Sequence, residues 1–362
     1  MRCIEHTLPG GIPGTQYHFQ SYHFGETGHD APHVYLQAGL HADELPGVLL
    51  LHRLRKRLMV LEAEGKLAGQ VALVPMCNPV GMAQHWAGQH HGRFETGSGE
   101  NFNRHYPDIS RQAADHMAQQ ALSPREALRA ALAALPRNQA LDYLRYTLMD
   151  MALAADMVLD VHCDSEAALH LYGNHRHSEA ATELAGFLQA GATLLCDEAG
   201  GMSFDDAVVQ NWRRLEQYVG RTLAIPFAVT VELRGVADVD DRFAARDEGA
   251  LLAWLVVQGV LRGEPVAAPQ PPYAPTPLEG VECVVAPHGG IVVYQLPYGQ
   301  WLPAGSRLGY VLDPLSGETT PLDTRHDGFY YARVAGRLIT AGTEVAFIAT
   351  ATPLRDGALL SA

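Results

Sequence analysis

The chain is poor in lysine and cysteine, and each scarcity excludes a class of protein. Only two of the 362 residues are lysines, Lys56 and Lys66, and the net charge is −14. No nucleic-acid partner is expected, because phosphate binding depends on clustered Lys and Arg. The five cysteines are scattered and never spaced C-x-x-C. That pattern favours neither a disulfide framework nor a cysteine zinc site, and it fits a reducing cytoplasm.

Long apolar segments are also missing. The longest, around residues 250–261, includes Gln258 and Gly259, whereas a membrane-spanning helix needs roughly 20 apolar residues. The first residues, MRCIEHTLPGGIPG, lack the basic cluster and apolar stretch of a secretory signal. Hydrophobic residues nevertheless make up 47% of the chain, so a large core is expected. The sequence predicts a soluble, cytoplasmic protein with no membrane partner.

Up to about residue 262, short β-prone runs alternate with longer helical patterns, which is typical of an α/β fold with a mixed or parallel sheet covered by helices. Six runs are predicted to be buried strands: HVYLQAGL, QVALVPM, DMVLDVH, ALHLYG, ATLLCDE and FAVTVEL. Five segments carry apolar residues at helical spacing: 46–61, 124–135, 140–154, 179–190 and 247–261.

A proline-rich stretch, EPVAAPQPPYAPTPLEG at residues 264–280, has almost no periodicity and is typical of a stiff connection. The sequence therefore predicts two domains, 1–265 and 266–362. In the second domain short β-prone runs alternate with glycine turns, so we expect it to be small and all-β.

The segment VYLQAGLHADELPG leads from a predicted strand through His41 to Glu44, just before a helix. Open α/β sheets place their sites at the carboxyl ends of strands. An imidazole nitrogen and a carboxylate oxygen are suitable zinc ligands. Alone, H-x-x-E is a weak signal that more often marks a solvated helix start.

A second predicted strand, in ADMVLDVHCDS, ends at His162. Two histidines and one glutamate are the protein ligands of a catalytic zinc that leaves its fourth position for water. A histidine at a strand end is more often an ordinary core or loop residue, and only the combination favours a metal site. The prediction is one Zn²⁺ per chain, held by His41, Glu44 and His162.

Two further segments carry side chains suited to catalysis. The loop GRFETGSGENFNRHYPD contains Arg93, Asn101, Asn103 and Arg104; an amide beside a guanidinium suits a substrate carboxylate, although a plain surface loop is the alternative. Glu232 interrupts the apolar run PFAVTVEL, where a carboxylate is costly unless it is paired or used. It is suited to act as a general base, or it points outward or pairs with Arg234.

The order GLHADE, NFNR, DVH, TVE resembles the zinc carboxypeptidase superfamily, and more closely its succinylglutamate desuccinylase and aspartoacylase branch. The resemblance covers nearly the whole chain and implies a carboxypeptidase-like mixed sheet flanked by helices, followed by a small β domain similar to a barrel-sandwich hybrid. It also implies a role for each motif residue: zinc ligands His41, Glu44 and His162, general base Glu232, carboxylate binders Asn103 and Arg104, and carbonyl polariser Arg93.

The motifs depart from the branch in two places. Ala42 stands where relatives have a glycine, so the turn must avoid a conformation open only to glycine. Asn101 replaces an aspartate that in relatives orients the first zinc-binding histidine. An amide oxygen can still accept the imidazole N–H, but without a negative charge the basicity of His41 should be lower.

The function predicted from these residues together with the resemblance is zinc-dependent hydrolysis of an N-acyl amino acid or a similar small carboxylate-bearing amide. The chemistry combines a zinc-activated water with Glu232 as the base. A zinc carboxypeptidase acting on peptides needs the same residues and is one alternative. A non-catalytic binding protein on the same fold is another, although a binder needs no base at residue 232. Homo-oligomerisation is left open.

Overall fold

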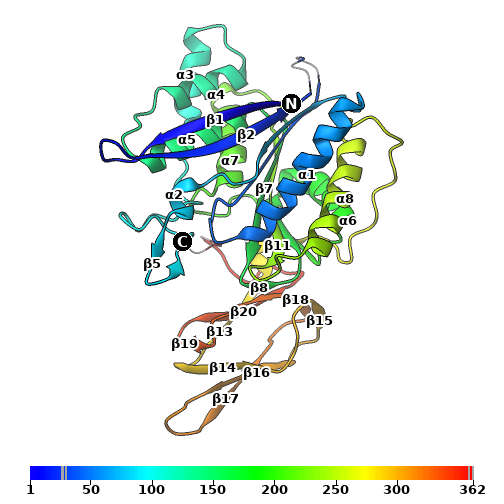
Figure 1. The fold of residues 1–362 in the computed structure, drawn as a ribbon. Coiled ribbons are helices and arrows are strands. Elements are labelled where there is room, and N and C mark those ends of the chain that lie inside the picture. Colours follow the sequence, from blue (N-terminus) through cyan, green and yellow to red (C-terminus); the bar gives the residue numbers. More distant parts are fainter. Residues whose placement is uncertain (26–27, 29–30, 358, 361–362) are drawn as a thin grey trace.

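A nine-stranded mixed sheet forms the centre of the computed structural model, which describes residues 1–25, 28, 31–357 and 359–360 (Figure 1). In order across the sheet the strands are β1 (Arg2–Pro9), β2 (Gln16–Phe24), β4 (Gln70–Val74), β3 (His33–Ala38), β7 (Met157–Asp164), β11 (Phe227–Gly235), β9 (His170–Asn174), β10 (Ala192–Cys196) and β12 (Thr276–Pro277). Strands β4, β3, β7 and β11 run parallel, so their carboxyl ends share one edge.

Helices cover both faces of this sheet (Figure 1). One face packs against α1 (Leu45–Ala63), α6 (Ser178–Leu188) and α8 (Asp241–Val257). The other packs against α3 (Ser110–Gln119), α4 (Pro124–Ala133), α5 (Ala140–Leu153) and α7 (Phe204–Val219). Each layer has its own apolar core, because the central parallel strands are buried on both sides. Within the described residues, every helix is too short or too polar to cross a membrane.

The last part of the chain forms two antiparallel sheets beside the α/β layers (Figure 1). One contains β13 (Val281–Val285), β20 (Glu344–Ala349), β18 (Gly328–Arg333) and β15 (Gln300–Leu302), with β8 (Glu166–Ala167) paired to β18. The other contains β17 (Thr319–Asp323), β16 (Arg307–Leu312), β14 (Gly290–Tyr294) and β19 (Leu338–Ile339). The five cysteines are free thiols.

The predicted fold class, a mixed sheet flanked by helices with a C-terminal all-β part, is confirmed. All six predicted strands are present, and the five predicted helices match α1, α4, α5, α6 and α8. The start of the last helix was wrong: α8 begins at Asp241, where Asp240 caps it by accepting a hydrogen bond from the Arg242 N–H. The division of the chain at residue 265 stays a prediction, and β12 still pairs with β10 beyond it.

Candidate metal centre and catalytic site

Three adjacent parallel strands bring the predicted site residues together. His41 follows β3, His162 lies near the end of β7, and Glu232 lies in β11 directly opposite His162 in the pairing register. Since β7 lies between β3 and β11, side chains from all three strand ends reach one region at the carboxyl edge of the sheet.

The turn between β3 and α1 sets the positions of His41 and Glu44. Gly39 has φ of 71°, a left-handed conformation that starts the turn at little cost only for glycine. The Glu44 N–H donates to the His41 carbonyl at 3.1 Å, and the Ala42 N–H donates to the Gly92 carbonyl at 2.9 Å. Ala42 does not have a positive φ, so the backbone at this point of the turn does not require a glycine.

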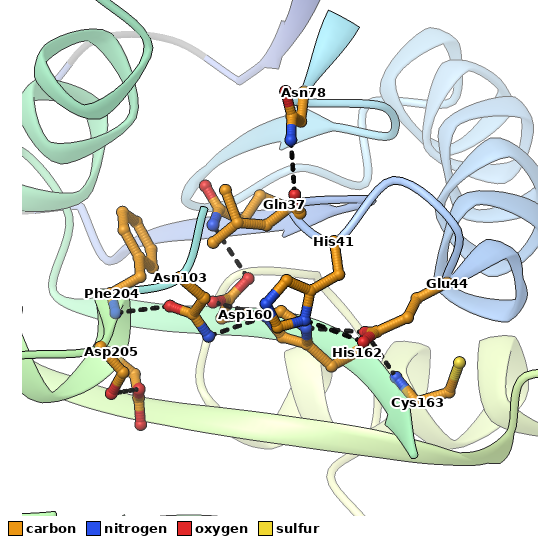
Figure 2. A network of polar contacts seen from close by, with 12 residues as sticks. Gln37, His41, Glu44, Asn78, Asn103, Asp160, His162, Cys163, Phe204 and Asp205 are labelled. Carbon is orange, nitrogen blue, oxygen red and sulfur yellow. Dashed lines mark hydrogen bonds and ion pairs between the residues drawn. The ribbon is translucent and has the colours of Figure 1, made fainter. Parts of the chain in front are cut away.

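The side chains of His41, Glu44 and His162 form a buried cluster whose candidate ligand atoms all lie within 4.8 Å of one another (Figure 2). Glu44 Oε1 lies 2.8 Å from His41 Nδ1, and Glu44 Oε2 lies 2.8 Å from His162 Nδ1. Zinc binds such atoms at roughly 2.0–2.2 Å. The cluster is therefore compact enough for one ion.

The opposite ring nitrogens show that this donor set fits a cation. His41 Nε2 lies 2.9 Å from Asn101 Oδ1, and His162 Nε2 lies 2.9 Å from Asp160 Oδ2. Both oxygens only accept, so each Nε2 carries the proton and donates it. If both histidines are neutral, each Nδ1 carries a lone pair that faces an oxygen of the Glu44 carboxylate. Nitrogen and oxygen are then both acceptors, so a proton or a metal ion must lie between them.

The charges around the two histidines differ. Burial lowers the pKa of His41, and the Glu44 carboxylate only partly offsets this. His162 is equally buried, but the carboxylates of Asp160 and Glu44 outweigh the burial and raise its pKa well above the ordinary value. Asp160 is itself completely buried and accepts a hydrogen bond from the Gln37 side chain at 2.9 Å (Figure 2). Asp160 therefore fixes the orientation of the His162 ring.

The loop after β4 brings Arg93 to the same cluster. Arg93 Nη1 lies 3.2 Å from His41 Nδ1 and 3.4 Å from Glu44 Oε1. The side chain is 45% exposed, so it can also reach a molecule in the adjoining cavity. The guanidinium therefore places a positive charge directly beside two of the three candidate ligands.

Asn103 and Arg104 are buried, and both line the cavity. Asn103 Oδ1 accepts a hydrogen bond from the Phe204 N–H at 2.8 Å, which leaves its amide Nδ2 on the His162 side (Figure 2). Arg104 Nη1 donates to the Asn103 carbonyl at 2.8 Å. Burial and the nearby Arg93 lower the pKa of Arg104, so an anion between the two guanidinium groups would be favoured.

Glu232 lines the cavity, and its Oε2 is buried without a hydrogen-bond partner in the described part of the chain. Burial, together with the carboxylates of Glu44 and Asp164, raises its pKa well above the ordinary value. The possible pairing with Arg234 does not occur, because Arg234 binds Asp247 through two hydrogen bonds of 2.7 and 2.8 Å. Glu232 is therefore a half-buried carboxylate beside the candidate ligands, and its Oε2 is enclosed without a hydrogen-bond partner among the described residues.

The cavity that these residues line has a volume of about 210 Å³. One side is formed by the strand ends and by the first turn of α7, with Asp205 and Asp206. The opposite side is formed by the C-terminal part of the chain, including Leu278, Tyr331 and Phe347. The all-β part thus supplies one wall of the site.

Sequence reasoning missed Asp160, Tyr172, Asp205 and Asp206, all of which lie in or next to the site. For Asp160 the signal was present: it lies two residues before His162 in a buried strand, hence on the same face. Asp205 and Asp206 lie on α7, a helix that was not predicted, and Tyr172 has no distinguishing sequence signal.

Comparison with known proteins decides the family. The family model described as the succinylglutamate desuccinylase/aspartoacylase catalytic domain matches residues 30–256, more than half of the chain. The chain belongs to the succinylglutamate desuccinylase/aspartoacylase family. The resemblance seen in the sequence motifs is thereby confirmed, and the matched residues include His41, Glu44, His162 and Glu232.

Individual known proteins are similar to this chain along most of their length. N-alpha-acetyl-L-2,4-diaminobutyric acid deacetylase of Halomonas elongata is 23% identical over 331 residues, which span 88% of this chain and 82% of that protein. A solved family structure from Shewanella amazonensis has 27% identity and a TM-score of 0.82, covering 97% of this chain and 99% of the other. One from Shewanella frigidimarina has 26% identity and a TM-score of 0.81, covering 96% and 97%.

Proposed function

We propose that this chain is a zinc-dependent deacylase that hydrolyses an N-acyl amino acid or a similar small, carboxylate-bearing amide. The observation that carries the proposal is the unpaired Glu232 carboxylate in the same cavity as His41, Glu44 and His162. Membership of a deacylase family supports amide hydrolysis. The similar Halomonas protein is a deacetylase of an N-acetylated amino acid, which supports the substrate class. A reducing cytoplasm, where free thiols persist, is part of the same proposal.

In this proposal His41, Glu44 and His162 hold one Zn²⁺. The compact, buried donor set and the two outward-facing Nε2–H groups support it. When bound, the ion would supply Lewis acidity, which polarises an amide carbonyl and lowers the pKa of a water molecule. Asn101 and Asp160 hold the imidazole rings in the tautomer that such binding requires.

Glu232 moves the proton in the proposed reaction. It accepts a proton from the attacking water and passes it to the nitrogen of the departing amine, since the scissile nitrogen must be protonated to leave. Its raised pKa makes the carboxylate a stronger base toward the proton of the water. Within the described part of the chain no hydrogen bond occupies Glu232 Oε2, which leaves this oxygen available for the transfer.

Asn103 and Arg104 bind the substrate carboxylate, and Arg93 stabilises the negative charge that develops on the carbonyl oxygen. The buried guanidinium group of Arg104, in a chain of net charge −14, supports local recognition of an anion. Arg93 lies beside the candidate ligands, where the carbonyl oxygen of an amide would be placed.

The two alternative functions are less well supported. A carboxypeptidase needs room for an extended peptide, whereas this cavity of about 210 Å³ is closed on one side by Leu278, Tyr331 and Phe347. A non-catalytic binding protein has no use for a carboxylate oxygen enclosed without a hydrogen-bond partner, as Glu232 Oε2 is among the described residues, because such an oxygen costs free energy.

A substrate panel tests the proposal. Release of free amine from N-acetyl and N-succinyl amino acids would be measured with purified protein, before and after removal of metal by a chelator, and after zinc is added back. The proposal predicts hydrolysis that is lost with the chelator and restored by zinc. Hydrolysis that persists in fully metal-free protein contradicts it, as does faster cleavage of C-terminal peptide bonds than of any N-acyl amino acid.

A further inference from the structure

If β11 were regular throughout, the Arg234 side chain would point to the same face of the sheet as the Glu232 side chain. Side chains alternate along a strand, and the residues that line the catalytic cavity follow this rule: Ala228, Thr230 and Glu232. The residues between them point to the opposite core, under α1 and α8: Val229, Val231 and Leu233. In a regular strand the Arg234 guanidinium would therefore lie beside the Glu232 carboxylate.

A break in the strand prevents this. Arg234 has φ of 64°, a left-handed conformation that is costly for a residue with a long side chain. The pairing register between β11 and β7 shifts between Glu232 and Gly235, which marks a β-bulge. Bulges redirect a side chain, and here the Arg234 side chain lines a second pocket instead, away from the catalytic cavity.

Contacts with α8 hold the redirected side chain in place. Asp247 is 2% exposed and accepts hydrogen bonds of 2.7 and 2.8 Å from the two terminal nitrogens of Arg234. The guanidinium carbon lies 4.5 Å from the centre of the Phe243 ring. The Gly235 N–H that follows the bulge donates to Asp238 Oδ2 at 2.9 Å. These contacts offset the cost of the left-handed backbone.

We propose that the ion pair between Arg234 and Asp247 withholds a guanidinium from Glu232 and so keeps the base unpaired. The inference rests on the proposed function, in which Glu232 transfers the proton. A salt bridge to Glu232 would occupy its oxygens with donors and hold it away from the attacking water. Arg234 and Asp247 are thus positioning residues, since neither touches the substrate.

Two variants that break the same ion pair from opposite ends test this. Asp247→Asn removes the charge of the acceptor but leaves the guanidinium in place; Arg234→Asn removes the guanidinium, and asparagine tolerates a positive φ. We expect Asp247→Asn to lower kcat by about tenfold or more with KM nearly unchanged, and Arg234→Asn to keep kcat within about threefold of the wild type. The double variant Arg234→Asn, Asp247→Asn should regain the wild-type kcat.

Zinc content and thermal stability of each variant are measured in parallel. If the ion pair is purely structural, both single variants should lose the same amount of kcat, and the double variant should not recover it. Either of these results overturns the proposal. If Asp247→Asn does not fold, Arg234→Lys replaces it: the cation is kept but one of the two hydrogen bonds is lost. Its kcat should then fall below that of Arg234→Asn, and a higher value contradicts the proposal.

Failure of the proposed function gives a different pattern. If Glu232→Gln is as active as the wild type, Glu232 is not the base, and both proposals fall. If Glu232→Gln is inactive while Asp247→Asn is fully active, the proposed function stands and only the role of the ion pair is wrong.

Discussion

Asn101 stands where the sequence resemblance leads us to expect an aspartate. Its Oδ1 accepts hydrogen bonds from His41 Nε2 and from the Asn103 N–H, at 2.9 Å each. An amide oxygen carries no net charge, so it makes the imidazole a weaker metal ligand than a carboxylate would.

Asn101→Asp should therefore tighten zinc binding by roughly tenfold or more, measured by competition with a chelator. The control is Asn138→Asp, which adds the same charge at an exposed residue. Equal zinc affinity in Asn101→Asp and the wild type would show that Asn101 does not govern His41.

Arg104 is the residue on which recognition of the substrate carboxylate depends in this account. Arg104→Ala should raise KM for carboxylate-bearing amides by roughly 10- to 100-fold, the value of a charge-assisted hydrogen bond, with a smaller change in kcat. The exposed Arg57→Ala changes the net charge equally and serves as the control. The proposed contact is wrong if a neutral amide analogue loses as much affinity as the carboxylate-bearing substrate.

The site residues that could be identified from the sequence are polar residues that interrupt or follow a run of apolar residues. His41 and His162 end apolar strands, and Glu232 is a carboxylate within one, so each was visible from neighbouring residues alone. The pairing of Arg234 with Asp247 could not be foreseen, because it depends on one left-handed residue and on a helix that packs on the opposite face.

At the scale of elements, the buried parallel strands were predicted well and the peripheral elements poorly. The hairpin of β1 and β2 was missed because its side chains are largely exposed and carry many polar residues. Helix α7 was missed, although FDDAVVQNWRRLEQYV carries two acids in its first turn, which is a signal of a helix start. Yet its first turn supplies Asp205 and Asp206 to the cavity.

Asp206 in α7 makes stability depend on pH. Burial raises its pKa to about 7, with the Asp205 and Glu198 carboxylates adding to the effect, against an ordinary value of 3.8. Between these values the folded state binds more protons than the unfolded state, so the free energy of unfolding falls as pH rises from about 4 to 7. Gln210 donates a hydrogen bond to Asp206 Oδ1 at 2.9 Å, which an asparagine would also accept.

Asp206→Asn should therefore raise the free energy of unfolding at pH 8. Its effect on the free energy of unfolding should be more favourable at pH 8 than at pH 4 by on the order of 3 kcal/mol. Urea unfolding at both pH values measures this. Glu179→Gln, an exposed acid in the first turn of α6, is the control and should show no such pH-dependent gain. A constant difference between Asp206→Asn and the wild type at both pH values would contradict the assignment.

At the scale of the whole molecule, the C-terminal part closes the site that the α/β part builds. Phe347 lies in β20, packs near Tyr331 and lines the cavity opposite the strand ends. A smaller residue there enlarges the space for an acyl group and leaves the candidate zinc ligands untouched.

Phe347→Ala should therefore raise kcat/KM for a longer acyl group relative to an acetyl group, with zinc content unchanged. Phe329→Ala removes the same side chain from a residue that lines the second pocket instead, and it should leave the ratio as in the wild type. An equal shift in both variants would mean that the C-terminal wall does not select the acyl group.

The most direct measurement for the account as a whole is kcat of the zinc-loaded Glu232→Gln variant on the best N-acyl amino acid. Glutamine keeps the size of the side chain but removes the base. If Glu232 is the base, kcat should fall by roughly 10²- to 10⁴-fold, with zinc content and thermal stability retained. A variant with near-normal kcat would contradict it and would require another group to take the proton from water.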